Sequence, residues 1–123
     1  MNNNLISRIS LVLYALVLLV FASGHFFNAA KMSNAIPSFI PGAIFWVYLT
    51  GVALILAAIS FIINKQVRVA GLLLGTLLLI FAFLVHLPGM IHATEDIMKW
   101  QSMGDMLRDL AMAAGAFYIG SKN

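Results

Sequence analysis

The sequence predicts an all-α integral membrane protein, built as a bundle of four antiparallel helices. The 123 residues are 63% hydrophobic and 9% charged, and the mean hydropathy is +1.01. A soluble domain of this length needs a polar surface, so this composition indicates that lipid surrounds the protein. Four apolar stretches could cross the bilayer, at residues 5–27, 43–63, 67–87 and 104–121. We expect residues 1–123 to form one membrane domain.

Charge and cysteine content exclude several classes of function. The net charge is +3, but the seven Lys and Arg residues are scattered and form no basic stripe for nucleic acid. The chain has no cysteine, which excludes a structural disulfide, a thiol–disulfide active site and cysteine ligands for zinc or an iron–sulfur cluster. We therefore expect the lipid bilayer as a partner, and no nucleic acid.

The first stretch, residues 5–27, carries Arg8 near its start and is apolar from Ile9 to Ala22 apart from Ser10 and the Tyr14 hydroxyl. A positive residue, an apolar run and the small residues of the FASG segment would also suit a cleaved signal peptide. We expect the stretch to be retained as the first membrane helix, because it is long enough to cross the hydrocarbon core.

The second stretch, residues 43–63, contains 21 residues without a charge. At about 1.5 Å per residue it is about 31 Å long, close to the thickness of a bilayer's hydrocarbon core. The loop before it carries Pro37 and Pro41, and each proline favours extended backbone in the preceding residue. Trp46 and Tyr48 lie near the helix start, where amphipathic rings meet lipid headgroups. We expect an ordered loop on the outer membrane surface, followed by a membrane helix.

The third stretch, residues 67–87, is predicted to end at Pro88-Gly89, since proline lacks the N–H group that a helix interior needs. The polar residues 90–103 then permit a short interfacial helix, with Trp100 at the membrane surface.

The fourth stretch, residues 104–121, is the weakest predicted span. It is short, and Asp105, Arg108 and Asp109 lie in its first turns, where charge inside a membrane is costly. Three of the four stretches carry small residues spaced four apart, which favours close helix packing and permits a homodimer. These pairs are Ala53 and Ala57, Gly71 and Gly75, and Ala111 and Gly115.

The distribution of Lys and Arg predicts that both termini lie in the cytoplasm. With four membrane helices, one side of the membrane carries Arg8, Lys65, Arg68 and Lys122, and the other carries Lys31 and Lys99, with Arg108 near a helix end. Positive residues are more frequent on the cytoplasmic side. The two longer loops then face outward.

Seven residues are predicted to meet at the outward end of the bundle. They are His25, Trp46, Thr50, His86, Asp105, Arg108 and Asp109. Asp105 and Asp109 share one helix face, and Arg108 should pair with Asp105 and contact anions at the rim. We expect an outward-facing polar pocket that is covered by residues 90–103 and binds a small ligand. The alternative is that these groups only anchor the helix ends at the interface.

Metal and haem sites are weaker alternatives. His92, Glu95 and Asp96 have a spacing that can bind a metal on a helix, although exposed helices often show this pattern by chance. A haem between His25 and His86 would need both rings to face inward at one depth. We expect no metal and no haem, and a quinone is the cofactor that this cluster would suit.

The chain resembles the DoxX-like family of small membrane proteins over the first three stretches, about two thirds of its length. The matching segments are Gly24-His25-Phe26-Phe27, Lys31 before Ile36-Pro37 and Ile40-Pro41, Trp46 to Gly51, Ala57-Ala58-Ile59, and the basic loop ending at Arg68 before Ala70-Gly71. Many relatives carry a glutamate shortly after the glycine of the second helix, where this chain has Leu54. We therefore expect no activity that needs an acidic group there.

This resemblance implies a multi-pass protein of the bacterial inner membrane, and some relatives belong to assemblies that pass electrons to quinone. The chain itself shows no complete catalytic motif, so we expect a non-catalytic membrane subunit or a ligand-binding bundle, with a redox protein as a further partner. The alternative is a quinone-linked oxidoreductase component, in which His25 or His86 donates to a quinone carbonyl and Asp109 relays the proton. Transport is a third alternative, which would need a dimer.

Overall fold

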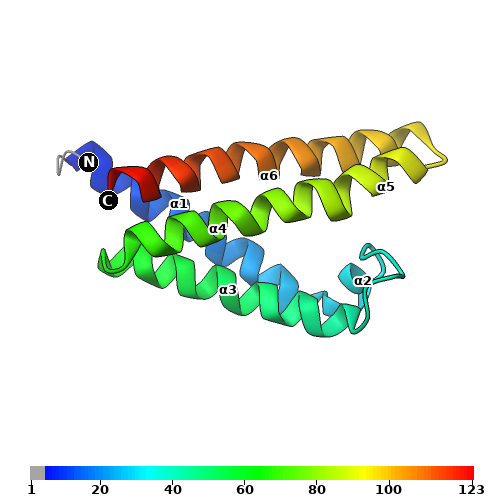
Figure 1. The fold of residues 1–123 in the computed structure, drawn as a ribbon, viewed down its shortest axis with the longest axis horizontal. Helices are drawn as coiled ribbons and strands as arrows, with labels where there is room; N and C mark the ends of the chain where they lie inside the picture. Colours follow the sequence, from blue (N-terminus) through cyan, green and yellow to red (C-terminus); the bar gives the residue numbers. More distant parts are fainter. Residues whose placement is uncertain (1–4) are drawn as a thin grey trace.

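The computed structural model describes residues 5–123, and these form helices and no strands. Four long helical rods run side by side (Figure 1). They are α1 (Leu5–Phe27), α3 (Ala43–Ile63), α4 (Val67–Phe81) with its continuations η1 (Ala82–His86) and α5 (Leu87–His92), and α6 (Asp96–Lys122). A short helix, α2 (Ala29–Ser33), follows α1.

The connections between the rods divide the molecule into two ends. The start of α1, the end of α6 and the turn between α3 and α4 lie at one end, which we call the terminal end (Figure 1). α2 and the turn between α5 and α6 lie at the other end, which we call the α2 end. Neighbouring rods along the chain therefore run in opposite directions.

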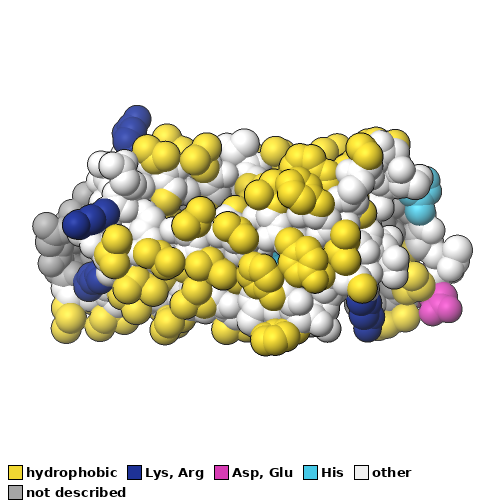
Figure 2. Space-filling view, turned by 90° about the horizontal axis from the view of Figure 1, so that it is seen from below, with side chains coloured by type: hydrophobic (Ala, Val, Ile, Leu, Met, Phe, Trp, Pro, Cys, Tyr) yellow, Lys and Arg dark blue, Asp and Glu magenta, His cyan; other side chains and the backbone are white. Residues whose placement is uncertain are grey.

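Three of the rods are long and apolar enough to cross a membrane. They are α1, α3 and the continuous helix from Val67 to His92. Large hydrophobic side chains are exposed along their length, for example Leu13, Leu56 and Leu73. Figure 2 shows hydrophobic side chains over the middle of one face, with charged side chains at the two ends. The prediction of an all-helical protein with membrane-type helices is confirmed.

The rods pack as two hairpins, α1 with α3 and α4 with α6. Gly71 allows the second hairpin to close tightly, since a Cβ atom on it would lie 2.6 Å from the backbone oxygen of Ala116 and 2.8 Å from the nitrogen of Gly120. α3 joins the hairpins by packing on α4, whereas the backbones of α1 and α6 do not come close to each other within residues 5–123. A gap between the two hairpins is therefore part of the fold.

Hydrogen bonds from two side chains, Arg8 and Tyr14, tie the first helix to the rest. Arg8 donates from Nη1 to the carbonyl oxygen of Phe61 at 3.0 Å, and from Nη2 to that of Ile62. These carbonyls lie in the last turn of α3, where helix oxygens lack partners and a cation is favoured. The Tyr14 hydroxyl donates to the carbonyl oxygen of Met112 and so bridges α1 to α6.

The predicted end of the third helix at Leu87 is wrong. Leu87 keeps helical backbone angles, with φ −64° and ψ −49°, and the helix continues through Pro88 to His92. A proline removes one helical hydrogen bond and clashes with the carbonyl of the residue four before it. Here the preceding turn is a π-helix, whose wider i→i+5 pattern accommodates the missing donor, so the rod continues without a break.

The predicted interfacial helix over residues 90–103 does not exist as a separate element. The chain reverses direction at residues 93–95, which are not helical, and α6 then runs unbroken from Asp96. Gly104, the predicted start of the fourth helix, lies inside α6 and does not interrupt it. The acidic Asp96 suits the positive end of the helix dipole, which explains the earlier start. α2 was also not predicted, although Ala, Lys and Met are good helix formers.

Candidate functional site

A cavity of about 370 Å³ lies between the two hairpins, toward the α2 end. All seven residues that were predicted to meet at the outward end line it, namely His25, Trp46, Thr50, His86, Asp105, Arg108 and Asp109. The other lining side chains are mostly apolar and come from every rod, including Leu18, Phe21, Val47, Leu54, Leu78, Phe81, Val85 and Met112. The cavity is therefore an apolar chamber with one cluster of charged and polar groups.

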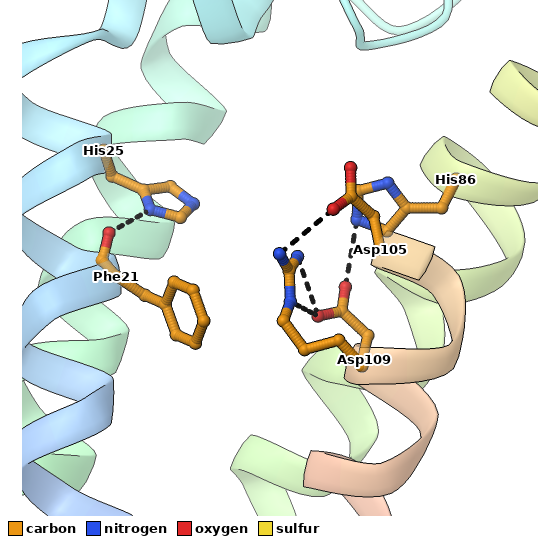
Figure 3. Close-up of polar contacts among 6 residues, drawn as sticks. Phe21, His25, His86, Asp105 and Asp109 are labelled. Carbon is orange, nitrogen blue, oxygen red and sulfur yellow. Dashed lines mark hydrogen bonds and ion pairs between the residues drawn. The ribbon is translucent and has the colours of Figure 1, made fainter. Parts of the chain in front are cut away.

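The charged cluster is centred on Asp109, which is 4% exposed. Its Oδ2 atom lies 3.0 Å from His86 Nε2, and its Oδ1 atom accepts from Arg108 Nη2 at 3.2 Å and Nε at 3.3 Å (Figure 3). Arg108 Nη1 also donates to Asp105 Oδ1 at 3.1 Å. The guanidinium group is thus shared between two carboxylates, and the buried carboxylate is satisfied on both oxygens.

The π-helix η1 places His86 in this cluster. His86 is its last residue and faces α6, so the ring reaches Asp109 from the neighbouring rod. π-turns inside α-helices are frequent at functional sites because they redirect a side chain without ending the helix. The π-turn therefore has two effects: it directs His86 toward Asp109, and it lets the helix continue through Pro88.

The α1 side of the cavity presents a histidine and an aromatic ring. His25 Nδ1 lies 2.8 Å from the carbonyl oxygen of Phe21. A carbonyl oxygen only accepts, so Nδ1 carries the proton, and Nε2 of the neutral ring is an acceptor. Figure 3 shows His25 and Phe21 on one side of the site, and His86, Asp105 and Asp109 on the other. The Phe21 ring also packs on Arg108, with the guanidinium carbon 4.8 Å from the ring centroid.

α3 contributes Trp46 and Thr50 on one helix face. Trp46 donates from Nε1 to the carbonyl oxygen of Pro41 at 2.9 Å, which ties the loop to the start of α3. Thr50 donates its hydroxyl to the carbonyl oxygen of Trp46 at 2.8 Å, so only its oxygen lone pairs remain for a ligand. Gly51 keeps α1 close, since a Cβ atom there would lie 3.1 Å from His25 Cβ.

Two details of the predicted pocket are wrong. Residues 90–103 do not line the cavity; Met32, Ala35 and Ile36 line it beside α2 instead. The polar segment belongs to the α5–α6 hairpin, whose turn extends past the start of α3, as Figure 1 shows. Arg108 is also no free anion contact, because two carboxylates hold it. Its spacing from Asp105 predicted that pair, but the contact with the adjacent Asp109 depends on the side-chain conformation.

Sequence reasoning missed the apolar lining of the cavity. Phe21, Met32 and Met112 were not singled out, because apolar residues in a membrane helix look the same whether they face lipid or a cavity. The position of Phe21, four residues before His25, was the available signal, since both lie on one face of α1.

No group of three or more metal-ligating side chains is assembled in residues 5–123. His92 ends α5 and Asp96 begins α6, so His92, Glu95 and Asp96 do not share a helix as the metal alternative required.

Comparison with known proteins gives a match to one family model. Residues 14–115 match the family described as "Domain of unknown function (DUF8561)". No curated protein matches the chain, and no solved structure matches it. The matched range includes every residue that lines the cavity, from Leu18 to Met112. Because the match spans most of its length, the chain belongs to the DUF8561 family.

Proposed function

We propose that this protein is a membrane-embedded bundle that binds one small amphiphilic molecule in the cavity between its two hairpins. The observation that carries the proposal is the make-up of the cavity, a mostly apolar chamber of about 370 Å³ with a single charged cluster. Ligand pockets are commonly of this size, with apolar walls and a few polar groups that fix orientation. The ligand's apolar body would contact Leu18, Leu54 and Leu78, and its head would face His25 and Asp105.

The proposed setting is the bacterial inner membrane, with four spans and both termini in the cytoplasm. The setting follows from the DoxX-like resemblance, and the orientation from Arg8, Lys65, Arg68 and Lys122 at the terminal end. α6 would be the fourth span; at about 40 Å it is longer than the hydrocarbon core, so its first turns could project outward. Single cysteines at Ser121 and Asn34 of this cysteine-free chain test the orientation: an impermeant thiol reagent should label only the second from outside whole cells.

A second candidate function is a quinone-linked redox subunit. It is supported by the contact of 3.0 Å between His86 and Asp109, because a histidine beside a buried carboxylate can pass a proton to a bound ring. The electrons would have to come from a partner protein, since the chain has no complete redox motif. A quinone extracted with the purified protein would favour this candidate over a purely binding role.

The test of ligand binding uses the two tryptophans of the chain. Trp46 lines the cavity and Trp100 does not, so Trp100→Phe leaves one fluorescent reporter at the site. A medium-chain alcohol that carries bromine on the part of its chain next to the head group should quench Trp46 with a saturable curve, because bromine quenches on contact and Trp46 lies at the same end of the cavity as the polar cluster. In Trp46→Phe the remaining Trp100 should show only the weak, linear quenching that comes from lipid.

Gly24→Phe supplies the matched control. Gly24 lines the cavity, and a Cβ atom added to it would meet nothing within 4 Å, so a larger side chain can start there without a backbone clash and add its bulk to the cavity wall. Gly104→Phe makes the same change at an exposed position that does not line the cavity. We expect the first variant to lose saturable quenching and the second to keep it. Saturable quenching that survives Gly24→Phe would overturn the proposal.

A further inference from the structure

We infer that the cavity selects a cationic amphiphile, a molecule with an ammonium head and an apolar body. This inference rests on the proposed ligand-binding function and adds the chemical class of the ligand. It follows from the charge of the lining, from the polar atoms that remain without partners, and from the way Arg108 is held.

The lining carries one negative charge in excess. Its charged side chains are Asp105, Asp109 and Arg108, and its histidines, His25 and His86, are counted as neutral. Two carboxylates and one guanidinium leave a formal charge of −1 in a mostly apolar chamber. A net charge beside mostly apolar walls favours a counter-ion more than the same charge in open water does, and the half-exposed position of Asp105 reduces this effect without removing it. An ammonium head would bring the sum to zero, whereas a carboxylate or phosphate head would bring it to −2 or below.

The position of Arg108 weakens the competing case for an anion. Its guanidinium donates to Asp105 on one side and to Asp109 on the other, and one face of the group packs on Phe21. An anionic head would have to separate the guanidinium from a carboxylate that it already neutralises. Fatty acids and phosphate esters are therefore disfavoured, although the site contains an arginine.

The polar atoms that remain are suited to receive N–H groups. In residues 5–123, Asp105 Oδ2 and His25 Nε2 have no hydrogen-bond partner, and Asp105 is the more exposed carboxylate of the pair, with 47% of its side chain accessible. His25 Nε2 is an acceptor because Nδ1 donates to Phe21. An ammonium group carries three donors and no acceptor, so it matches these atoms.

The experiment compares three probes that differ only in the head group. They are a bromoalkyl amine, the corresponding alcohol and the corresponding carboxylate, titrated into the Trp100→Phe protein in nanodiscs of phosphatidylcholine, which has no net charge. The buffer is set near pH 8, where free histidine is neutral. We expect saturable quenching of Trp46 by all three, with the amine binding about tenfold more tightly than the carboxylate and the alcohol between them.

A substitution that removes one negative charge then tests whether Asp105 causes the preference for the amine. Asp105→Asn keeps the shape of the side chain and removes the excess charge, so the amine should lose its advantage over the carboxylate. Asp96→Asn makes the same change at an exposed position of α6 outside the cavity, and it should leave the advantage intact.

The outcomes separate the two proposals. If the carboxylate binds as tightly as the amine, or if Asp105→Asn preserves the preference, the cationic ligand class is wrong and the binding function stands. A preference that Asp96→Asn also abolishes would reflect general surface charge and would overturn the inference as well. If no probe quenches beyond the Gly24→Phe background, the binding function itself fails.

Discussion

Asp109 is the residue on which the candidate site depends. It is 4% exposed, and its two oxygens are divided between two partners. His86 reaches one oxygen from η1, and Arg108, the adjacent residue on α6, holds the other. A buried carboxylate is tolerated only when it is paired and hydrogen-bonded. Asp105 holds the same arginine from a half-exposed position, so water screens its share of the interaction. The two carboxylates therefore have different roles, which the sequence alone could not assign.

We predict that Asp109→Asn and Asp105→Asn differ in stability. The first should lower the free energy of unfolding by about 1–3 kcal/mol, because it weakens the hydrogen bonds that His86 and Arg108 make to a buried acceptor. The second should cost less than about 1 kcal/mol. Thermal unfolding in detergent, followed by helical circular dichroism, measures both. Equal losses would show that Asp109 is not the buried centre of the cluster.

At the scale of the helices, the α4–α6 contact holds the second hairpin together. Gly71 and Gly120 bring the two backbones together, and Gly75 meets the ring of Phe117. Close backbone approach through small residues is the main means of helix association in lipid, where no hydrophobic effect drives packing. This contact fixes the rotation of α6, and with it the direction in which Asp105 and Asp109 point.

We predict that Gly71→Ala destabilises the protein although alanine favours helix. Its methyl group would lie 2.6 Å from the carbonyl oxygen of Ala116, a backbone atom that cannot move without displacing α6. A cost of about 1–3 kcal/mol is typical of such overpacking. Gly104→Ala on the same hairpin has no atom within 4 Å and should gain about 0.5–1 kcal/mol from helix propensity. A neutral Gly71→Ala in the same melting assay would argue against this packing.

The helices show which features a sequence can reveal. Hydropathy placed the apolar rods, because a long uncharged run such as residues 43–63 has few alternatives to a helix in lipid. It did not reveal that the helix would pass through Pro88, since the π-turn depends on local backbone adjustment rather than on composition. It also could not join residues 96–103 to the fourth rod, because a polar helix and a polar loop have similar compositions.

The candidate site was predictable as a set of residues but less so as a structure. Ionisable residues in an apolar chain are few, so the depth of each along its helix was enough to group His25, His86, Asp105, Arg108 and Asp109. Which of them pair with each other depends on side-chain conformations. Which segment covers the cavity depends on the path of a loop. Hydropathy predicts neither the side-chain conformations nor the loop path.

At the scale of the whole molecule, the cavity follows from the way the hairpins are joined. α3 packs on α4, whereas α1 reaches α6 through side chains such as Tyr14 and Phe21. The space that remains toward the α2 end is lined by residues of both hairpins. The central claim is that a small amphiphile occupies this space, and the methionines of the chain can report on it directly.

Methyl NMR of protein labelled at its methionine methyl groups is the most direct test of that claim. Met32 and Met112 line the cavity, whereas Met90, Met98, Met103 and Met106 do not. On titration with a medium-chain alkylamine in nanodiscs, the signals of Met32 and Met112 should shift with saturation and show magnetisation transfer from the alkyl chain, and Gly24→Phe should abolish both effects. Saturable shifts at Met90 and Met98, with Met32 and Met112 unmoved, would contradict a ligand site between the hairpins.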